Sequence, residues 1–415
     1  MLNARDMAVK AKQAAHQVAQ AGTEQKNQVL RTLARLIHEN REYLFKENQK
    51  DIEQAEKNGL NKSLIDRLRL DEKVIQEMQA SLLDVAGLPD PVGFMTSMSR
   101  RPNGLAVGRM RIPIGVILII YESRPNVTVE AFSLCLKSGN AVILKGGSEA
   151  AHSNRALAGL IAEALKQNHL LAEIAQFVAT GDRAFIYELL TLNELIDLVI
   201  PRGGEALIRN VVEKSRIPVL KHYKGVCHIY IDESADPNMG YEICLNAKVQ
   251  KPSACNALET LLVHEALAEA FLPEMAKRLQ SQGVRLKGCE KTVAILKDIE
   301  KAEEQDWHEE YLDLVLSIKV VNNIDEAIGH IRKYGSDHTE AIVTKNYDHA
   351  WKFVREINSS LVLVNASTRF NDGFQLGLGA EMGISTTKLH AFGPMGLEEL
   401  TVTKFIAFGD GQIRE

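Results

Sequence analysis

The chain has 415 residues, of which 45% are hydrophobic, and its formal net charge is −5. This length predicts two or three domains around a large core, and a sequence without a basic block argues against nucleic acid as the main partner. Five cysteines without a C-x-x-C spacing argue against a disulfide framework and a zinc ribbon. They fit a reducing cytosol. We expect a cytoplasmic protein, because the first residues form an amphipathic helical pattern rather than a signal peptide.

The first half of the chain begins with helices. Residues 4–86 predict charged amphipathic helices, and residues 96–111, around Pro102-Asn103-Gly104, predict a β-hairpin. Strands and helices then alternate, with expected strands at 114–120, 141–144, 176–179 and 198–200. Short buried strands that alternate with helices predict an α/β fold with a parallel, doubly wound sheet.

A second alternating block begins near Gly225. Its expected strands are 227–231, 258–263, 314–321, 341–343 and 361–364, and its expected helices are 237–250, 265–282, 324–333 and 348–357. We therefore expect a first domain at 1–225 and a second at 226–364. The last segment, 365–415, is expected to return to the first domain and to end in an alternating strand at 400–408.

Cys255 is the candidate nucleophile. It follows Pro252-Ser253-Ala254 and precedes the apolar run 258–263, which predicts a turn ahead of a buried strand. A substrate can reach a thiol at such an edge while the backbone N–H of the same residue points to the same place. A buried structural cysteine is the alternative. The other thiols carry less signal: Cys135, Cys227 and Cys244 lie in core patterns, and Cys289 lacks a constrained context.

Two turns in which glycines join a strand to a helix are candidate anion sites. Free backbone N–H groups at a helix N-terminus bind phosphate groups, and a nearby cation adds to the attraction. Neither turn matches the P-loop or the G-x-G-x-x-G pattern, so an ordinary tight turn remains an alternative for each. The residues concerned are Lys145, Gly146 and Ser148 in the first turn and Gly203 and Gly204 in the second.

A third segment follows the expected strand 114–120, at the end where open α/β sheets bind ligands. Asn126 either donates its amide to a developing oxyanion or caps a helix. Arg124 either holds a substrate carboxylate or pairs with a surface acid.

His330 and His338 suggest a triad or a metal site, and we reject both. Ser336, Asp337 and His338 are too close in sequence to form a triad, and no third ligand is spaced for zinc. We expect a turn packed at the edge of the second domain and no metal site.

Together these segments resemble the aldehyde dehydrogenase superfamily and, more narrowly, the gamma-glutamyl phosphate reductases, over essentially the whole length. Residues 321–342 resemble the signature stretch of that family, and residues 121–127 and 250–256 are also characteristic of it. The resemblance implies two doubly wound domains, of which the first binds NADPH and the second carries the nucleophilic cysteine, and a small β oligomerisation flap.

The resemblance also implies roles for single residues. Cys255 becomes the nucleophile and Asn126 the oxyanion donor. The implied cofactor contacts are Lys145 at the adenine ribose with Gly146 and Ser148 beside it, Gly203 and Gly204 at the pyrophosphate, and Glu310 at the nicotinamide ribose. Arg124, Ser367 and Arg369 are candidates for binding the substrate.

One departure from the superfamily bears on the reaction. Oxidising aldehyde dehydrogenases carry a glutamate base in an E-L-G-G-K segment, whereas residues 220–225 of this chain contain no acid. Because that base activates water against a thioester, its loss favours a reductase that exchanges the acyl group with phosphate. The implied reaction is the NADPH-dependent reduction of L-glutamyl 5-phosphate to L-glutamate 5-semialdehyde and phosphate through a Cys255 thioester, the second step of proline biosynthesis from glutamate.

Two other functions remain as alternatives. A cysteine hydrolase or acyltransferase without nicotinamide would need a histidine base near Cys255, and no motif places one there. A catalytically idle binding protein is less compatible with the presence of Cys255, Asn126 and Lys145 together.

Assembly is expected to involve the hairpin and the last strand. Residues 96–111 and 400–408 alternate in polarity without an evident partner in the two sheets, and exposed strands of this kind pair with another chain. We expect a homodimer or tetramer. The resemblance also allows a transient contact with glutamate 5-kinase.

Overall fold

The N-terminal helices cover the first sheet. The computed structural model describes residues 3–60 and 62–414. Its first helices are α1 (Ala4–Gln20), α2 (Thr23–Glu39), α3 (Arg41–Lys57), α4 (Lys62–Leu68) and α5 (Glu72–Gly87). Asn3 and Asp71 cap α1 and α5, because their side chains accept hydrogen bonds from Asp6 N and Val74 N. Apolar stripes of α2 and α5 pack into the same core as the sheet.

The first sheet is parallel, with the strand order β5-β4-β3-β6. Its strands are β3 (Val116–Tyr121), β4 (Ala141–Lys145), β5 (Ala175–Phe177) and β6 (Leu198–Arg202), and its helices are α6 (Asn126–Lys137), α7 (Ala151–Gln167), α8 (Arg183–Thr191) and α9 (Glu205–Lys214). Every residue of β3 is buried, as expected for a central parallel strand. In register, Ile120 lies beside Lys145, and Tyr121 lies beside Arg202, so the three carboxyl ends share one edge.

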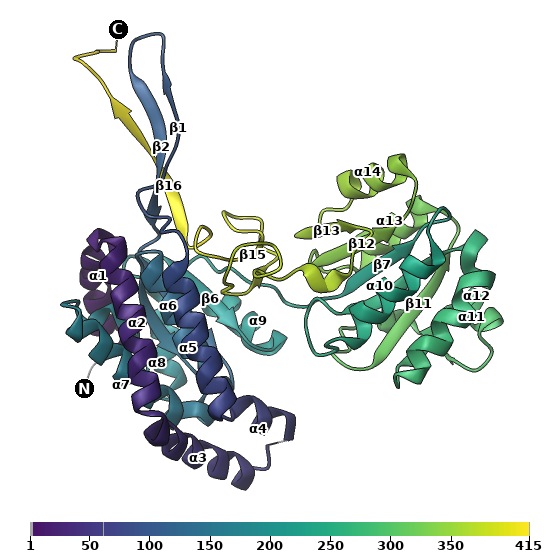
Figure 1. Cartoon of the computed structure of the whole chain (residues 1–415), viewed down its shortest axis with the longest axis horizontal. Coiled ribbons are helices and arrows are strands. Elements are labelled where there is room, and N and C mark those ends of the chain that lie inside the picture. The colour runs from purple at the N-terminus through teal and green to yellow at the C-terminus, as the bar shows by residue number, and fades with distance from the viewer. Residues whose placement is uncertain (1–2, 61, 415) are drawn as a thin grey trace.

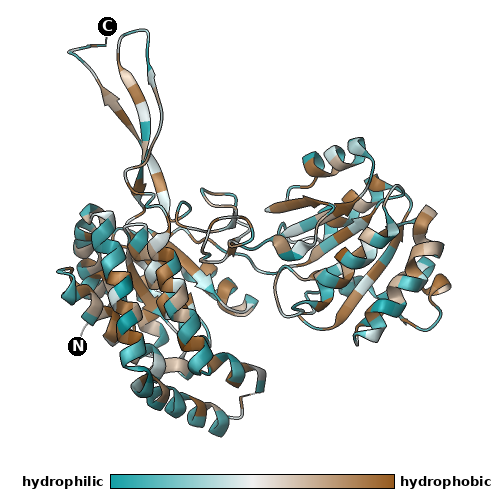
Figure 2. Ribbon diagram, in the orientation of Figure 1, coloured by the Kyte–Doolittle hydropathy of each residue, from teal (hydrophilic) through white to brown (hydrophobic). Residues whose placement is uncertain are grey.

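The second sheet is also parallel and has the order β10-β9-β11-β8-β7-β12-β13. Its strands are β7 (Cys227–Ile231), β8 (Leu258–His264), β9 (Arg285–Gly288), β10 (Glu300–Lys301), β11 (Val315–Val321), β12 (Thr339–Val343) and β13 (Leu361–Val364). Its helices are α10 (Pro237–Val249), α11 (Glu265–Ser281), α12 (Glu290–Ile295), α13 (Ile324–Tyr334) and α14 (Tyr347–Glu356). Figure 2 shows apolar sheets behind helices whose outer faces are polar.

A third, antiparallel sheet forms an arm that projects from the rest of the molecule (Figure 1). It consists of β1 (Met95–Arg100), β2 (Ala106–Pro113) and β16 (Thr401–Phe408), and β16 pairs with β2 from Thr401–Pro113 to Phe408–Ala106. Before β16, the segment with β14 (Ile384–Ser385) and β15 (Gly393–Pro394) lies between the two parallel sheets (Figure 1). The hairpin and the last strand, which had no evident partner in the parallel sheets, therefore pair with each other through β2 and β16.

The expected α/β class, with two parallel sheets and a small β sheet, is confirmed, and each strand expected from the sequence is present within a few residues of its expected limits. The strands β9 and β10, at one side of the second sheet, and the short pair β14 and β15 were not expected. The domain limits at 225 and 364 stay a prediction. Among the described residues, no helix is both long enough and apolar enough to span a bilayer.

Candidate active site

Cys255 lies in the turn between α10 and β8 and is partly buried. Its main chain packs directly on Gly225, since a Cβ atom built on Gly225 would lie 1.9 Å from the carbonyl oxygen of Cys255. The thiol of Cys227 donates to the same carbonyl at 3.2 Å. Asn256 Nδ2 donates to the carbonyl of Asn371 at 2.9 Å, which holds the residue after Cys255 in place. Position 225 therefore requires a glycine.

The thiol of Cys255 is protonated at neutral pH in this structure. Burial raises its pKa to about 11, and the carboxylates of Glu310 and Glu381 act in the same direction. The guanidinium of Arg202 and the backbone N–H of Cys255 itself favour the thiolate. A thiolate at Cys255 therefore forms near neutral pH only when the environment of the thiol changes or when a base takes its proton.

Two histidines lie beside Cys255. One ligand atom each from His222, Cys255 and His338 lies within 4.8 Å of the other two. The two imidazole rings meet edge to face, with centroids 5.5 Å apart. Burial lowers the pKa of His222 to about 4 and that of His338 to about 3, and both rings are therefore neutral near pH 7.

The interpretation of His338 from the sequence is wrong in one respect. His338 does lie in a bend, between α13 and β12, but it is fully buried next to Cys255 rather than at the edge of the domain. No sequence motif placed a histidine near Cys255, yet two of them lie there. His222 lies in the segment 220–225, where oxidising aldehyde dehydrogenases carry a glutamate base. It was missed because the sequence does not show which strands are neighbours in the sheet, and so not which preceding residues meet.

Asn126 is the first residue of α6, and its side chain does not cap that helix. Its Nδ2 donates to Glu130 Oε1 at 2.8 Å instead. The helix-cap alternative therefore finds no support in the structure. To stabilise an oxyanion, the amide would have to leave Glu130.

Arg124 and Arg369 both interact electrostatically with Cys255. Desolvation lowers the pKa of each guanidinium, and the negative form of Cys255 opposes that shift. Arg369 Nε donates to Gln250 Oε1 at 2.8 Å. Ser367, the third substrate candidate, is buried, and its Oγ accepts from Arg369 N at 3.3 Å. Together with Arg202, these two arginines favour the negative form of Cys255, and Ser367 supports one of them.

In the first glycine turn, the lysine side chain and the first glycine both contact nearby atoms of the chain. Lys145 ends β4, its Nζ donates to the carbonyl of Gly146, and burial lowers its pKa. A Cβ atom on Gly146 would lie 2.1 Å from Asn154 Nδ2. Ser148 begins the short 3-10 helix that leads into α7. This close packing explains why position 146 is a glycine. Lys145 lies at the carboxyl edge of the sheet.

The second glycine turn already accepts an anionic oxygen. Gly204 caps α9, and its N–H donates to Glu122 Oε2 at 2.9 Å. A Cβ atom on Gly203 would lie 2.5 Å from the same oxygen. Glu310 lies elsewhere, and its Oε1 accepts from Gly225 N at 2.9 Å, which places it beside the Cys255 loop. The second glycine turn and Cys255 thus flank the segment that joins the two sheets.

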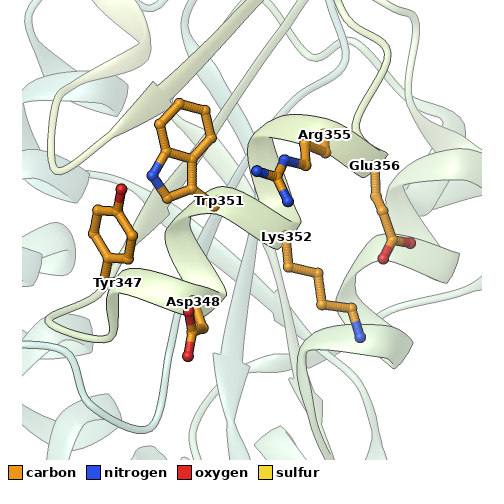
Figure 3. Close-up of a pocket in the computed structure, with 6 residues that line it drawn as sticks. All are labelled: Tyr347, Asp348, Trp351, Lys352, Arg355 and Glu356. Carbon is orange, nitrogen blue, oxygen red and sulfur yellow. The ribbon is translucent and has the colours of Figure 1, made fainter.

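A surface hollow lies on α14, away from these residues. Figure 3 shows that the side chains that line it project from this one helix: Tyr347, Asp348, Trp351, Lys352, Arg355 and Glu356. None of them belongs to the site predicted from the sequence.

Comparisons with known proteins agree on one family. The model of the aldehyde dehydrogenase family matches residues 3–292. The gamma-glutamyl phosphate reductase of Desulfatibacillum aliphaticivorans is 58% identical over 99% of this chain and 98% of its own, and that of Thermodesulfovibrio yellowstonii is 56% identical over 98% of each. The crystal structure of the gamma-glutamyl phosphate reductase of Thermotoga maritima superposes with a TM-score of 0.98, at 47% identity and full coverage of both chains.

Proposed function

We propose a function on one premise: this chain belongs to the aldehyde dehydrogenase family and, within it, to the gamma-glutamyl phosphate reductases. It reduces L-glutamyl 5-phosphate to L-glutamate 5-semialdehyde and phosphate, in the synthesis of proline from glutamate. The observation that carries this proposal is the packing of the Cys255 main chain on Gly225, beside Glu310 and with arginines acting on the Cys255 thiol, in a chain that matches these reductases from end to end.

The proposed role of Cys255 is to form a thioester. Its thiolate attacks the acyl carbon, a C–S bond forms, and phosphate leaves with the electron pair of the broken C–O bond. After reduction, the C–S bond of the thiohemiacetal breaks, and the product aldehyde and the Cys255 thiolate are released. Arg124 and Arg369 are the proposed partners of the anionic substrate, because both cations already interact with Cys255.

Asn126 and the backbone N–H of Cys255 are the proposed oxyanion donors. The N–H of Cys255 favours the negative form of its own side chain, so it is directed toward the reacting sulfur. The amide of Asn126 would exchange Glu130 for the oxyanion when substrate binds. After this exchange, the Asn126 amide would donate a hydrogen bond to the negative charge that develops on the acyl oxygen only during the reaction.

NADPH is the proposed cofactor, and its chemistry is the supply of a hydride to the thioester carbon. The residues present fit such a group. The N-terminus of α9 holds a carboxylate oxygen of Glu122 on Gly204 N and can hold a phosphate oxygen in the same way. Lys145 offers a cation at the end of β4, on the other side of β3 from β6, with Gly146 and Ser148 beside it. Glu310 is the proposed partner of the ribose nearest the nucleophile.

Phosphate rather than water is the proposed acyl acceptor in the reverse direction. The segment 220–225 reaches Cys255 through Gly225 and contributes His222 rather than a carboxylate. The two acids that influence the thiol are engaged, since Glu310 accepts from Gly225 N and Glu381 accepts from Gly373 N. The thioester should therefore hydrolyse slowly.

A homodimer or tetramer in the cytoplasm is the proposed working form. The arm of β1, β2 and β16 exposes large apolar side chains, among them Met95, Met98, Phe405 and Phe408, and Phe94 just before β1 is exposed as well. Exposed apolar strands of this kind favour contact with a second copy. All five cysteines are free thiols, which fits a reducing compartment.

The test supplies glutamate semialdehyde and NADP⁺ and follows the formation of NADPH with and without phosphate. We expect turnover only with phosphate, and none from Cys255→Ser. Cys289→Ser, which removes another partly buried thiol, should remain active. Phosphate-independent turnover would identify an oxidising dehydrogenase. Release of acyl groups without any nicotinamide would identify a hydrolase.

A further inference from the structure

Cys255, His222 and His338 form a cluster of three soft donors. Each of them precedes a strand of the second sheet: His222 precedes β7, Cys255 precedes β8, and His338 directly precedes β12. The strand order β8-β7-β12 makes these three strands neighbours, and their amino ends lie at one edge of the sheet. Three separate segments therefore hold the cluster in place.

The separations suit a small metal ion after a modest adjustment. The three ligand atoms lie within 4.8 Å of one another. Zinc–sulfur and zinc–nitrogen bonds of about 2.3 and 2.0–2.1 Å in a tetrahedron require ligand atoms about 3.5 Å apart. Rotation of the side chains that brings them about 1 Å closer would complete the geometry.

Each histidine has a nitrogen free to bind a metal. His222 Nδ1 lies 2.9 Å from the carbonyl oxygen of Ile384, so it carries the proton and leaves a lone pair on Nε2. A metal-binding histidine in proteins is typically oriented by such a bond. His338 is fully buried, its Nδ1 lies 2.7 Å from Thr339 Oγ1, and its Nε2 has no hydrogen-bond partner among the described residues. A buried nitrogen without a partner calls for an explanation, and an ion provides one.

We propose that Cys255, His222 and His338 bind one thiophilic divalent cation, Zn²⁺ above all, when no substrate is present. One thiolate and two imidazoles select Zn²⁺ or Co²⁺ over Mg²⁺ or Ca²⁺, which prefer oxygen ligands. The ion displaces the proton of the Cys255 thiol, which goes to solvent, and a water molecule completes the coordination. This proposal rests on the positions of the three side chains and does not depend on the reaction that the protein catalyses.

The consequence for activity rests on the proposed function. If Cys255 is the nucleophile, its sulfur cannot both coordinate zinc and attack the acyl carbon. The cation then acts as a reversible inhibitor that competes with substrate and shields the thiol from alkylation.

The experiment titrates Co²⁺ into the chelator-treated, full-length protein and records the thiolate-to-cobalt charge-transfer absorbance. We expect one ion per chain, and loss of this band in Cys255→Ser. His222→Gln and His338→Asn should each weaken binding by at least about tenfold. Cys289→Ser, which removes a partly buried thiol elsewhere, and His16→Gln, which removes an exposed histidine, are the matched controls and should keep the band.

His222→Gln decides the matter if the fully buried His338 proves necessary for folding, because His222 is only partly buried. A missing band in the wild-type protein overturns the proposal, and so does a band of unchanged affinity in His222→Gln. Loss of turnover in His222→Gln with unchanged Co²⁺ affinity also overturns it, and would make His222 a proton acceptor instead. Reductase activity in Cys255→Ser would refute the proposed function without touching the cobalt measurement.

Discussion

Gly225→Ala should misplace the nucleophile without unfolding the protein. The new methyl group would lie 1.9 Å from Cys255 O, whereas real Cβ atoms essentially never come within 3.0 Å of another heavy atom. The Cys255 loop must therefore move by at least about 1 Å, and a displacement of this size costs roughly a hundredfold in rate. The overpacking itself should cost about 1–3 kcal/mol of stability.

The assay for Gly225→Ala compares kcat/KM and the melting temperature with those of the wild-type protein. Gly329→Ala is the matched control, because Gly329 lies within α13 and has nothing within 4 Å of its would-be Cβ. This control should keep full activity and gain about 0.5–1 kcal/mol of stability. Wild-type kcat/KM in Gly225→Ala would refute the contact between Gly225 and the nucleophile loop.

The remaining predictions concern the donor, the cofactor, the thiol and the arm. Asn126→Ala should lower kcat by roughly a hundredfold with little change in cofactor affinity; a fall in affinity alone would assign Asn126 a structural role. Lys145→Ala should raise KM for NADPH and leave kcat near wild type, since Lys145 is expected far from the hydride; a collapse of kcat would contradict that placement. Because the pKa of Cys255 is raised to about 11, the thiolate fraction grows as pH rises toward that value, so alkylation of the ligand-free protein should speed up about tenfold per pH unit between pH 7 and 9; a plateau below pH 9 would show a lower pKa. Deletion of residues 400–415 removes β16 from β2 and should yield monomers or aggregates by light scattering; an intact chain that is itself a monomer at micromolar concentration would contradict the proposed assembly.

The sequence predicts the strands and helices whose residues carry a strong local pattern. The run Cys227–Ile231 is uniformly buried and was expected with the same limits. The strands β9 and β10 were missed because Arg285–Gly288 mixes charged and apolar residues and Glu300–Lys301 is only two residues long. Elements of this kind depend on pairing with β11 and with each other, which no local pattern records.

In the candidate site, too, residues with a local sequence signal were predicted and residues without one were missed. Cys255 was identifiable from its turn and from the family resemblance. His222 and His338 were not, because their proximity to the thiol arises from the order of β8, β7 and β12 and from no spacing in the sequence. Two hydrogen bonds likewise depend on side-chain positions that follow only from the folded chain. In one, Asn126 donates to Glu130, and in the other, Gly204 N donates to Glu122.

The most direct test of the Cys255 thioester supplies glutamate semialdehyde and NADP⁺ to the protein in the absence of phosphate. The mechanism predicts a burst of about one NADPH per chain, a glutamyl adduct on the peptide that contains Cys255 by mass spectrometry, and steady turnover once phosphate is added. Steady turnover without phosphate, or a burst without an adduct on Cys255, would contradict it.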